Sequence, residues 1–165
     1  MPAVDQEVYL GQHELYTDKD AGKEGHHKFD MRSMADEDPT YVVMNGETYA
    51  TTPHRCGPAA TVETGDTVRT YFVTGGPNLT SSYHLIGNVW EKLYPEGSLS
   101  TDPQTHIQTK PVAPGSTTIA TMDFPVPGDY KLVDHALSRV ARRGCMSVVR
   151  AEGEEDPEVF DPDPN

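Results

Sequence analysis

The stretch QTHIQTKPVAPGSTTIATMDFPVPGDYKLVDH, residues 104–135, decides the fold of this chain. Its Val, Ile and Thr residues alternate with polar residues, and Pro114-Gly115 and Pro127-Gly128 interrupt the pattern at short intervals. An alternation of period two between Pro-Gly turns is typical of half-buried β-strands. The stretch therefore predicts three strands joined by tight turns.

The segments on either side continue the same pattern. Asn45-Gly46 and Gly65-Asp66 are turn signals within two of them. Residues 89–98 are apolar, but Pro95 and Gly97 interrupt them. Further strands are predicted within 6–16, 40–50, 60–75, 81–87 and 145–153. Seven or eight short strands with closely spaced turns predict an all-β Greek-key β-sandwich or a small barrel.

One short helix is predicted just before the last strand. In ALSRVARR, residues 136–143, the residues Ala136, Leu137, Val140 and Ala141 fall on one helical face. The arginines lie in the last turn, where they complement the helix dipole, and Gly144 is placed to end the helix.

The 165 residues suit one domain with additional chain at its ends. Residues 17–38 are polar and lack a sustained period, so 1–39 is interpreted as an arm that contains one strand. Residues 40–153 then form the domain, and the acidic, Pro-rich 154–165 form a tail.

The net charge of −13 resides mostly in the arm and the tail. This distribution excludes nucleic acid as the expected partner, because phosphate binding needs clustered Lys and Arg. No apolar run approaches the roughly 20 residues of a membrane span. The N-terminus shows no basic and apolar signal-peptide pattern, so none is expected in this chain.

The two cysteines, Cys56 and Cys145, leave two interpretations open. Two buried thiols are expected, and a disulfide between them is the alternative in an oxidising compartment. A type 1 copper centre needs two His, a Cys and usually an axial Met. Because no histidine follows Cys145, this chain is predicted to hold no type 1 copper. Zinc motifs of the CxxC or HExxH type are also absent.

Two of the seven histidines stand at element boundaries. His84 lies between a turn-rich loop and an apolar strand end, and His135 follows Asp134 where strand gives way to helix. On composition alone, each is expected to be a hydrogen-bonded structural residue. Asp134 precedes His135, but in a strand it points the opposite way and is not expected to orient that imidazole.

Several segments together resemble the second cupredoxin domain of copper-containing nitrite reductases. GPNLTSSYHLIG (76–87) and LVDHAL (132–137) are the most specific, and VYLGQHELYTDKDAGKEG (8–25) is similar to the segment that joins the two domains in that family. The other matching segments are VVMNGETYA (42–50), GDTVRTYFVTGGPNLTSSYHLIG (65–87), QTKPVAPGSTTIATMDFPVPGDYKLVDHAL (108–137) and RRGCMSVVRAEGE (142–154). The resemblance implies a cupredoxin-like sandwich.

The resemblance also implies a shared copper site. In that family three subunits of two cupredoxin domains each form a ring, and the first domain carries the type 1 copper, an aspartate and two of the three histidine ligands of the type 2 copper. At the matched positions, His135 corresponds to the third ligand, from the neighbouring subunit. His84 corresponds to the active-site histidine, Ile86 to an apolar residue over the substrate, and Thr109, more weakly, to a residue that orients the histidine.

The implied activity is the reduction of nitrite to nitric oxide, outside the cytoplasm. The first-domain features are absent from this chain, so activity is expected only together with a first-domain cupredoxin chain or neighbouring subunits. The sequence does not identify the electron donor. The alternative is a non-catalytic cupredoxin fragment or interaction module without its own copper centre.

Overall fold

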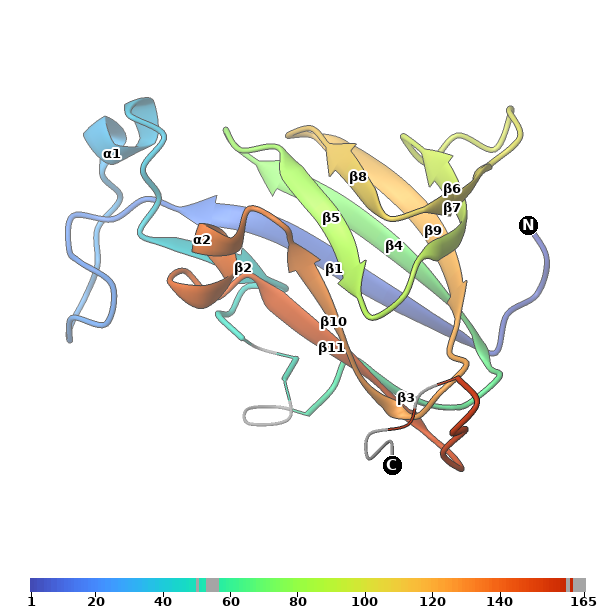
Figure 1. The fold of residues 1–165 in the computed structure, drawn as a ribbon. Helices are drawn as coiled ribbons and strands as arrows, with labels where there is room; N and C mark the ends of the chain where they lie inside the picture. The colour runs from blue at the N-terminus through green and yellow to red at the C-terminus, as the bar shows by residue number, and fades with distance from the viewer. Residues whose placement is uncertain (50, 53–56, 160, 162–165) are drawn as a thin grey trace.

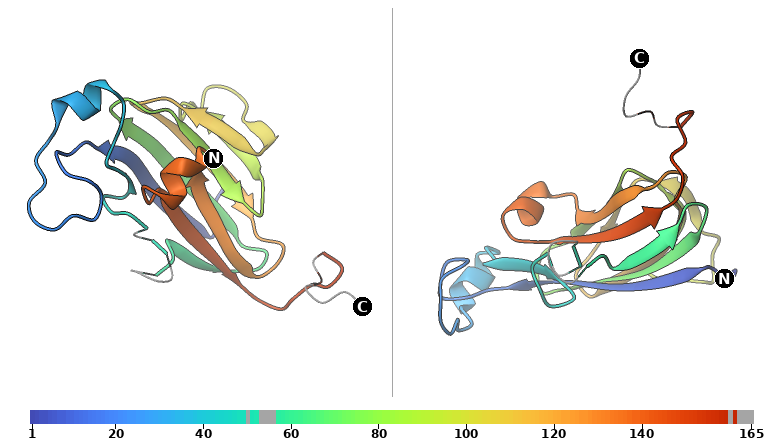
Figure 2. Two further views of the ribbon diagram at one scale, coloured as in Figure 1. Left: turned by 60° about the vertical axis from the view of Figure 1, so that its left-hand side comes forward. Right: turned by 90° about the horizontal axis from the view of Figure 1, so that it is seen from below.

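The structure is a computed structural model that describes residues 1–49, 51–52, 57–159 and 161. Two β-sheets pack face to face, and Figure 2 shows the layer with β10 and β11 lying over the layer with β1. The six-stranded sheet runs β2 (Tyr41–Met44), β1 (Gln6–Leu15), β4 (Thr67–Gly76), β9 (Ser116–Asp123), β6 (Trp90–Pro95) and β7 (Gln104–Ile107). The five-stranded sheet runs β3 (Ala60–Glu63), β11 (Met146–Glu152), β10 (Gly128–Asp134), β5 (Ser81–Ile86) and β8 (Thr109–Val112).

The core lies between the two sheets and is centred on an aromatic stack. Phe72 of β4, Tyr83 of β5 and Trp90 of β6 are fully buried. Their rings stack with centroid distances of 3.9 Å between Phe72 and Tyr83 and 4.7 Å between Tyr83 and Trp90. Large aromatic side chains of this kind account for much of the apolar area that a small domain buries. The stack therefore joins the two sheets directly beneath the strand that carries His84.

The strand of the predicted arm is an interior strand. β1 pairs with β4 in parallel and with β2 antiparallel, so it has a neighbour on each side. Val8 and Leu10 face the core and are buried, as the alternation in this segment predicts. The boundary at residue 39 stays a prediction, but the strand before it belongs to the sandwich.

The predicted all-β sandwich with one short helix before the last strand is confirmed (Figure 1). The described residues hold eleven strands rather than seven or eight, since 104–135 contains four and β6 forms despite Pro95, which stands at its end. β3 and β4, on either side of the Gly65-Asp66 turn, belong to different sheets.

The helices are short. α2 (Leu137–Ala141) lies where a helix was predicted, but it is five residues long and buries none of them; Leu137 is 53% exposed. A second helix in the arm, α1 (Met31–Ala35), was not predicted, and the Asp30 carboxylate caps it by accepting the Arg32 N–H. In the described residues, no helix is long and apolar enough to cross a membrane.

Candidate metal centre

His84 lies on β5 with its side chain on the outer face of the five-stranded sheet. Its neighbours Tyr83 and Leu85 point into the core, so strand alternation turns His84 outward. Its Nδ1 lies 2.7 Å from the Gln108 carbonyl oxygen and 3.1 Å from Thr109 Oγ1. A carbonyl only accepts, so the contact assigns the proton to Nδ1 and leaves Nε2 without a hydrogen-bond partner among the described residues. Thr109 is also the register partner of His84 on β8.

His135 is the first residue after β10 and lies beside His84. Its backbone N–H donates to the Ser82 carbonyl at 2.8 Å, which continues the pairing of β10 with β5 by one residue. The two imidazole rings meet edge to face, with centroids 4.8 Å apart and an interplanar angle of 73°. The His135 side chain is exposed, and its ring makes no hydrogen bond within the described part of the chain. The exposed His135 ring, which makes no hydrogen bond among the described residues, thus lies next to the His84 ring, whose Nδ1 is hydrogen-bonded to the Gln108 carbonyl.

Ile86 lies two residues beyond His84 on the same face of β5. Its side chain is 40% exposed, which is high for isoleucine within a strand. It pairs in register with Lys131 of β10. An apolar side chain therefore lies on the same outer face of the sheet as His84.

Asp134 points the opposite way from His135, as strand alternation predicts. Its carboxylate is fully buried and accepts four hydrogen bonds, from Ser82 N at 3.0 Å, Ala136 N at 3.1 Å, Gln12 Nε2 at 3.0 Å and Arg139 Nη1 at 2.6 Å. None of these donors is the His135 ring. The carboxylate instead ties together the backbone on both sides of that histidine.

A second buried carboxylate, which sequence reasoning missed, holds the loop that leads into β5. Glu14 of β1 accepts Asn78 N at 2.8 Å, Leu79 N at 3.1 Å and Tyr16 Oη at 2.9 Å. Burial raises the pKa of Tyr16 to about 12, so this hydroxyl keeps its proton and donates to Glu14. The alternation in 6–16 already places Glu14 and Gln12 on the inward face with Val8 and Leu10, and that was the available signal.

The donor set fits one ligand of a metal site. The described residues contain no group of three or more His, Cys, Asp or Glu side chains placed to hold a metal ion. An exposed imidazole without a hydrogen bond is a suitable donor for copper, and His135 meets this condition. Burial raises the pKa of the Cys145 thiol, so the free thiol stays protonated at neutral pH. Cys56 lies outside the described residues, and Cys145 is a free, buried cysteine, as one of the two interpretations expected.

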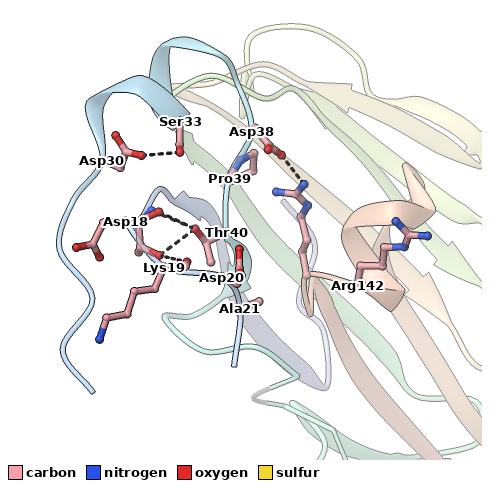
Figure 3. Close-up of a pocket in the computed structure, with 12 residues that line it drawn as sticks. Asp18, Lys19, Asp20, Ala21, Asp30, Ser33, Asp38, Pro39, Thr40 and Arg142 are labelled. Atoms are coloured by element: carbon pink, nitrogen blue, oxygen red, sulfur yellow. Dashed lines mark hydrogen bonds and ion pairs between the residues drawn. The ribbon is translucent and has the colours of Figure 1, made fainter. Parts of the chain in front are cut away.

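A polar cavity of about 400 Å³ lies between the arm and α2, away from the two imidazoles (Figure 3). The side chains of three of the four aspartates that line it have partners among the described residues. Asp30 accepts the Ser33 hydroxyl, Asp18 accepts the Lys28 N–H, and Asp38 pairs with Arg143 at 2.6 Å. These contacts hold the arm together and join it to the segment after α2, and the described residues provide no metal-ligand group here.

Comparison with known proteins confirms the resemblance to copper-containing nitrite reductases. No protein-family model matches the chain. It is 37% identical over 160 residues to a copper-containing nitrite reductase of Neisseria meningitidis serogroup B, covering 97% of this chain and 40% of that protein. The copper nitrite reductase structure from Nitrosomonas europaea superposes with a TM-score of 0.80 at 29% identity, over 96% of this chain and 53% of that one. The copper-containing nitrite reductase of Thermus scotoductus gives 0.77 at 28% identity, over 93% and 32%.

These matches establish the cupredoxin-like form of the sandwich. The chain spans about two fifths of the length of the curated relative from Neisseria.

Proposed function

We propose that this chain, which matches copper-containing nitrite reductases over almost its whole length, is their second, C-terminal cupredoxin half. In this proposal it takes part in the reduction of nitrite to nitric oxide at a type 2 copper. His135 supplies one of three histidine ligands. The other two ligands, and the type 1 copper that delivers the electron, belong to the part of the relatives' length that this chain does not cover.

The observation that carries the proposal is the pair of imidazoles on the outer face of the five-stranded sheet. His135 offers an exposed ring without a hydrogen bond, 4.8 Å from the His84 ring between centroids. A lone histidine is an incomplete metal site, and the described residues supply no further donors. An incomplete site at the molecular surface is what a ligand set divided between two chains or domains requires.

The reaction consumes one electron and two protons per nitrite and releases nitric oxide and water. When bound, copper supplies a Lewis acid for a nitrite oxygen and the electron. His84 supplies one proton: with Nδ1 held by the Gln108 carbonyl, its Nε2 is the atom that gains and loses the proton. Imidazole suits this step because its ordinary pKa lies close to neutral pH.

Two further residues shape the site in this proposal. The Thr109 hydroxyl, 3.1 Å from His84 Nδ1, restricts rotation of the ring and so keeps Nε2 directed at the substrate. The exposed Ile86 side chain provides an apolar wall that limits the orientations of a small anion. Neither side chain transfers a proton.

Reconstitution tests the ligand assignment. The chain is combined with a first-domain cupredoxin chain that carries a type 1 copper, and copper content, the type 2 electron paramagnetic resonance signal and nitrite-dependent nitric oxide are measured. We expect His135→Ala to abolish the type 2 signal and nitric oxide formation. His106→Ala, an exposed histidine of β7, is the matched control and should leave both unchanged. An assembly without copper and without nitric oxide formation contradicts the proposal and favours a non-catalytic module.

The role of His84 is tested separately from copper binding. His84→Ala should keep the type 2 signal, lower turnover by about 10²–10⁴-fold, as loss of a general acid does, and remove one ionisation from the pH–rate profile. Thr109→Val should reduce turnover less, because Gln108 still holds the ring. Loss of copper in His84→Ala would show that this residue is a ligand instead.

The proposal extends to assembly and location on the same resemblance. We place the complete enzyme in a ring of three copies, outside the cytoplasm, with nitrite as substrate. Light scattering of the reconstituted complex measures the number of copies directly.

A further inference from the structure

We propose that the buried ion pair between Asp134 and Arg139 is a positioning device that fixes His135 for metal binding. The inference rests on the proposed function, because it concerns how this chain holds its own ligand residue. Asp134 and Arg139 do not contact the His135 ring in the described structure, so they act through the backbone.

The Asp134 carboxylate holds the backbone on both sides of His135. Its Oδ1 accepts the N–H of Ala136, the residue after His135, at 3.1 Å. The same oxygen accepts the N–H of Ser82 on β5 at 3.0 Å, while the Ser82 carbonyl accepts the His135 N–H at 2.8 Å. One carboxylate thus holds the residue after His135 and also Ser82, which in turn accepts the His135 N–H on the strand that carries His84.

Arg139 secures this carboxylate from α2. Its Nη1 donates to Asp134 Oδ2 at 2.6 Å and to the Thr80 carbonyl at 2.7 Å, which lies just before β5. Arg139 therefore links the helix after the ligand to the strand beside it. The Arg139 side chain is 21% exposed against 0% for Asp134, so the pair is largely shielded from solvent and is screened less than a surface pair.

The opposite sheet completes the support. Gln12 of β1 donates to Asp134 Oδ2 at 3.0 Å, and its own amide oxygen accepts the Ser81 hydroxyl at 2.7 Å. Gln12 and Ser81 are fully buried. The carboxylate is thus held from the six-stranded sheet, from β5 and from α2 at once.

This arrangement has a function beyond stability. A buried charge is costly unless it is paired and hydrogen-bonded, so an apolar residue would be the simpler choice if packing were the only demand. Groups that support a metal ligand through hydrogen bonds set the ligand's orientation, and their loss weakens metal affinity by about 10- to 100-fold. A short helix with no buried residues cannot hold the segment by packing. The ion pair performs that task for the residues next to His135, while the Tyr49 hydroxyl donates to the Val140 and Ala141 carbonyls at the C-terminal end of α2.

The test uses the full chain with Cu²⁺ alone as the probe. Ring resonances of His135 and His84 are followed by NMR during a Cu²⁺ titration, and the paramagnetic broadening of each ring gives an apparent Kd for that residue. Arg139→Met removes the charge and keeps the chain length, Arg139→Lys restores a donor, and Arg142→Met is the matched control on the same segment. Leu93→Ala, a fully buried residue of β6, is the control for lowered stability.

We expect Arg139→Met to raise the apparent Kd at His135 by about tenfold, at the lower end of the range for groups behind a metal ligand. Arg139→Lys should recover part of the loss, and Arg142→Met and Leu93→Ala should match the wild type. Amide exchange at His135 and Ala136 should accelerate in Arg139→Met while that of Phe72 in the core stays slow.

An unchanged Kd in Arg139→Met, within about twofold of the wild type, overturns the inference and leaves the proposed function intact, whatever the variant's stability. An equal loss in Leu93→Ala also overturns it, because the effect would then follow global stability. If Cu²⁺ broadens the His84 ring resonances equally in His135→Ala and in the wild type, His135 is not a ligand. Both the ligand assignment and this inference then fail.

Discussion

Replacing Glu14 by alanine should destabilise the protein far more than its position in a predicted arm suggests. The Glu14 carboxylate is buried and accepts three hydrogen bonds, from Asn78 N, Leu79 N and the Tyr16 hydroxyl. Two of these donors are backbone groups of the loop that enters β5. Alanine leaves both N–H groups without the partner that β1 provides.

The size of the effect follows from these contacts. A hydrogen bond to a charged group contributes about 1.5–3 kcal/mol net, and a buried donor left unpaired costs about 1–3 kcal/mol. The terms are not additive, and removal of Glu14 also relieves the desolvation of its own charge, so we expect a loss of about 3 kcal/mol. Glu14→Gln keeps one acceptor but turns an NH₂ group toward the donors, and should lose about half as much.

Urea unfolding monitored by circular dichroism measures this difference. With an m-value of about 2 kcal/mol/M, a loss of 3 kcal/mol lowers the midpoint by roughly 1.5 M. Glu91→Ala, an exposed glutamate of β6, is the matched control and should change the free energy of unfolding by less than about 0.5 kcal/mol. A change below about 1 kcal/mol in Glu14→Ala, with an unaltered m-value, refutes the argument that this carboxylate holds the loop.

Three further outcomes follow from the same structure. Hydrogen bonds from Tyr9 and Tyr71, with Arg69 alongside, lower the pKa of Glu7 below its ordinary 4.5. The ionised carboxylate therefore stabilises the fold above pH 4.5, and this contribution is lost as the pH falls through the folded-state pKa. The Tm difference between Glu7→Gln and wild type should be largest at neutral pH and vanish in strong acid. Because burial raises the pKa of its thiol, Cys145 should resist a thiol reagent in a Cys56→Ser chain until urea unfolds the protein, and rapid labelling of the native chain would contradict this. A chain without residues 1–16 should show no cooperative thermal transition by circular dichroism, because β2 then loses the strand that joins it to the sheet and β4 keeps a neighbour on one side alone, β9. A chain ending at Gly153 should keep its transition.

The fold class could be predicted because alternation and turn residues are local properties. Runs such as 116–123 and 128–134 carry the period of two within a few residues, and the corresponding strands formed. Pairing between distant strands is not a local property. The parallel pairing of β1 with β4 joins segments about 60 residues apart, and nothing within 6–16 indicates it. Hence β1 was placed in an arm while the structure places it inside a sheet.

The same reasoning explains what was missed around the two histidines. Alternation correctly predicted that Asp134 and His135 point to opposite sides, since that depends only on strand geometry. The donors to Asp134 could not be predicted, because Gln12 lies 122 residues away in sequence and comes from the other sheet. The short helix was predicted from an apolar face, but none of its residues is fully buried; Arg139 anchors it through an ion pair, and the Tyr49 hydroxyl donates to the Val140 and Ala141 carbonyls.

An incomplete but rigid ligand set has a thermodynamic consequence for the proposed enzyme. A single imidazole binds copper weakly, so tight binding requires the donors on the other side of the interface. Any ligand that binds the assembled state better than the separate parts must stabilise the assembly by the same free energy. The buried Asp134–Arg139 pair strengthens this coupling, because a ligand that is already fixed loses little freedom when the metal binds. In the proposed enzyme, the affinity for copper and the affinity between the parts that share it then rise and fall together, and the fixed position of His135 helps to set both.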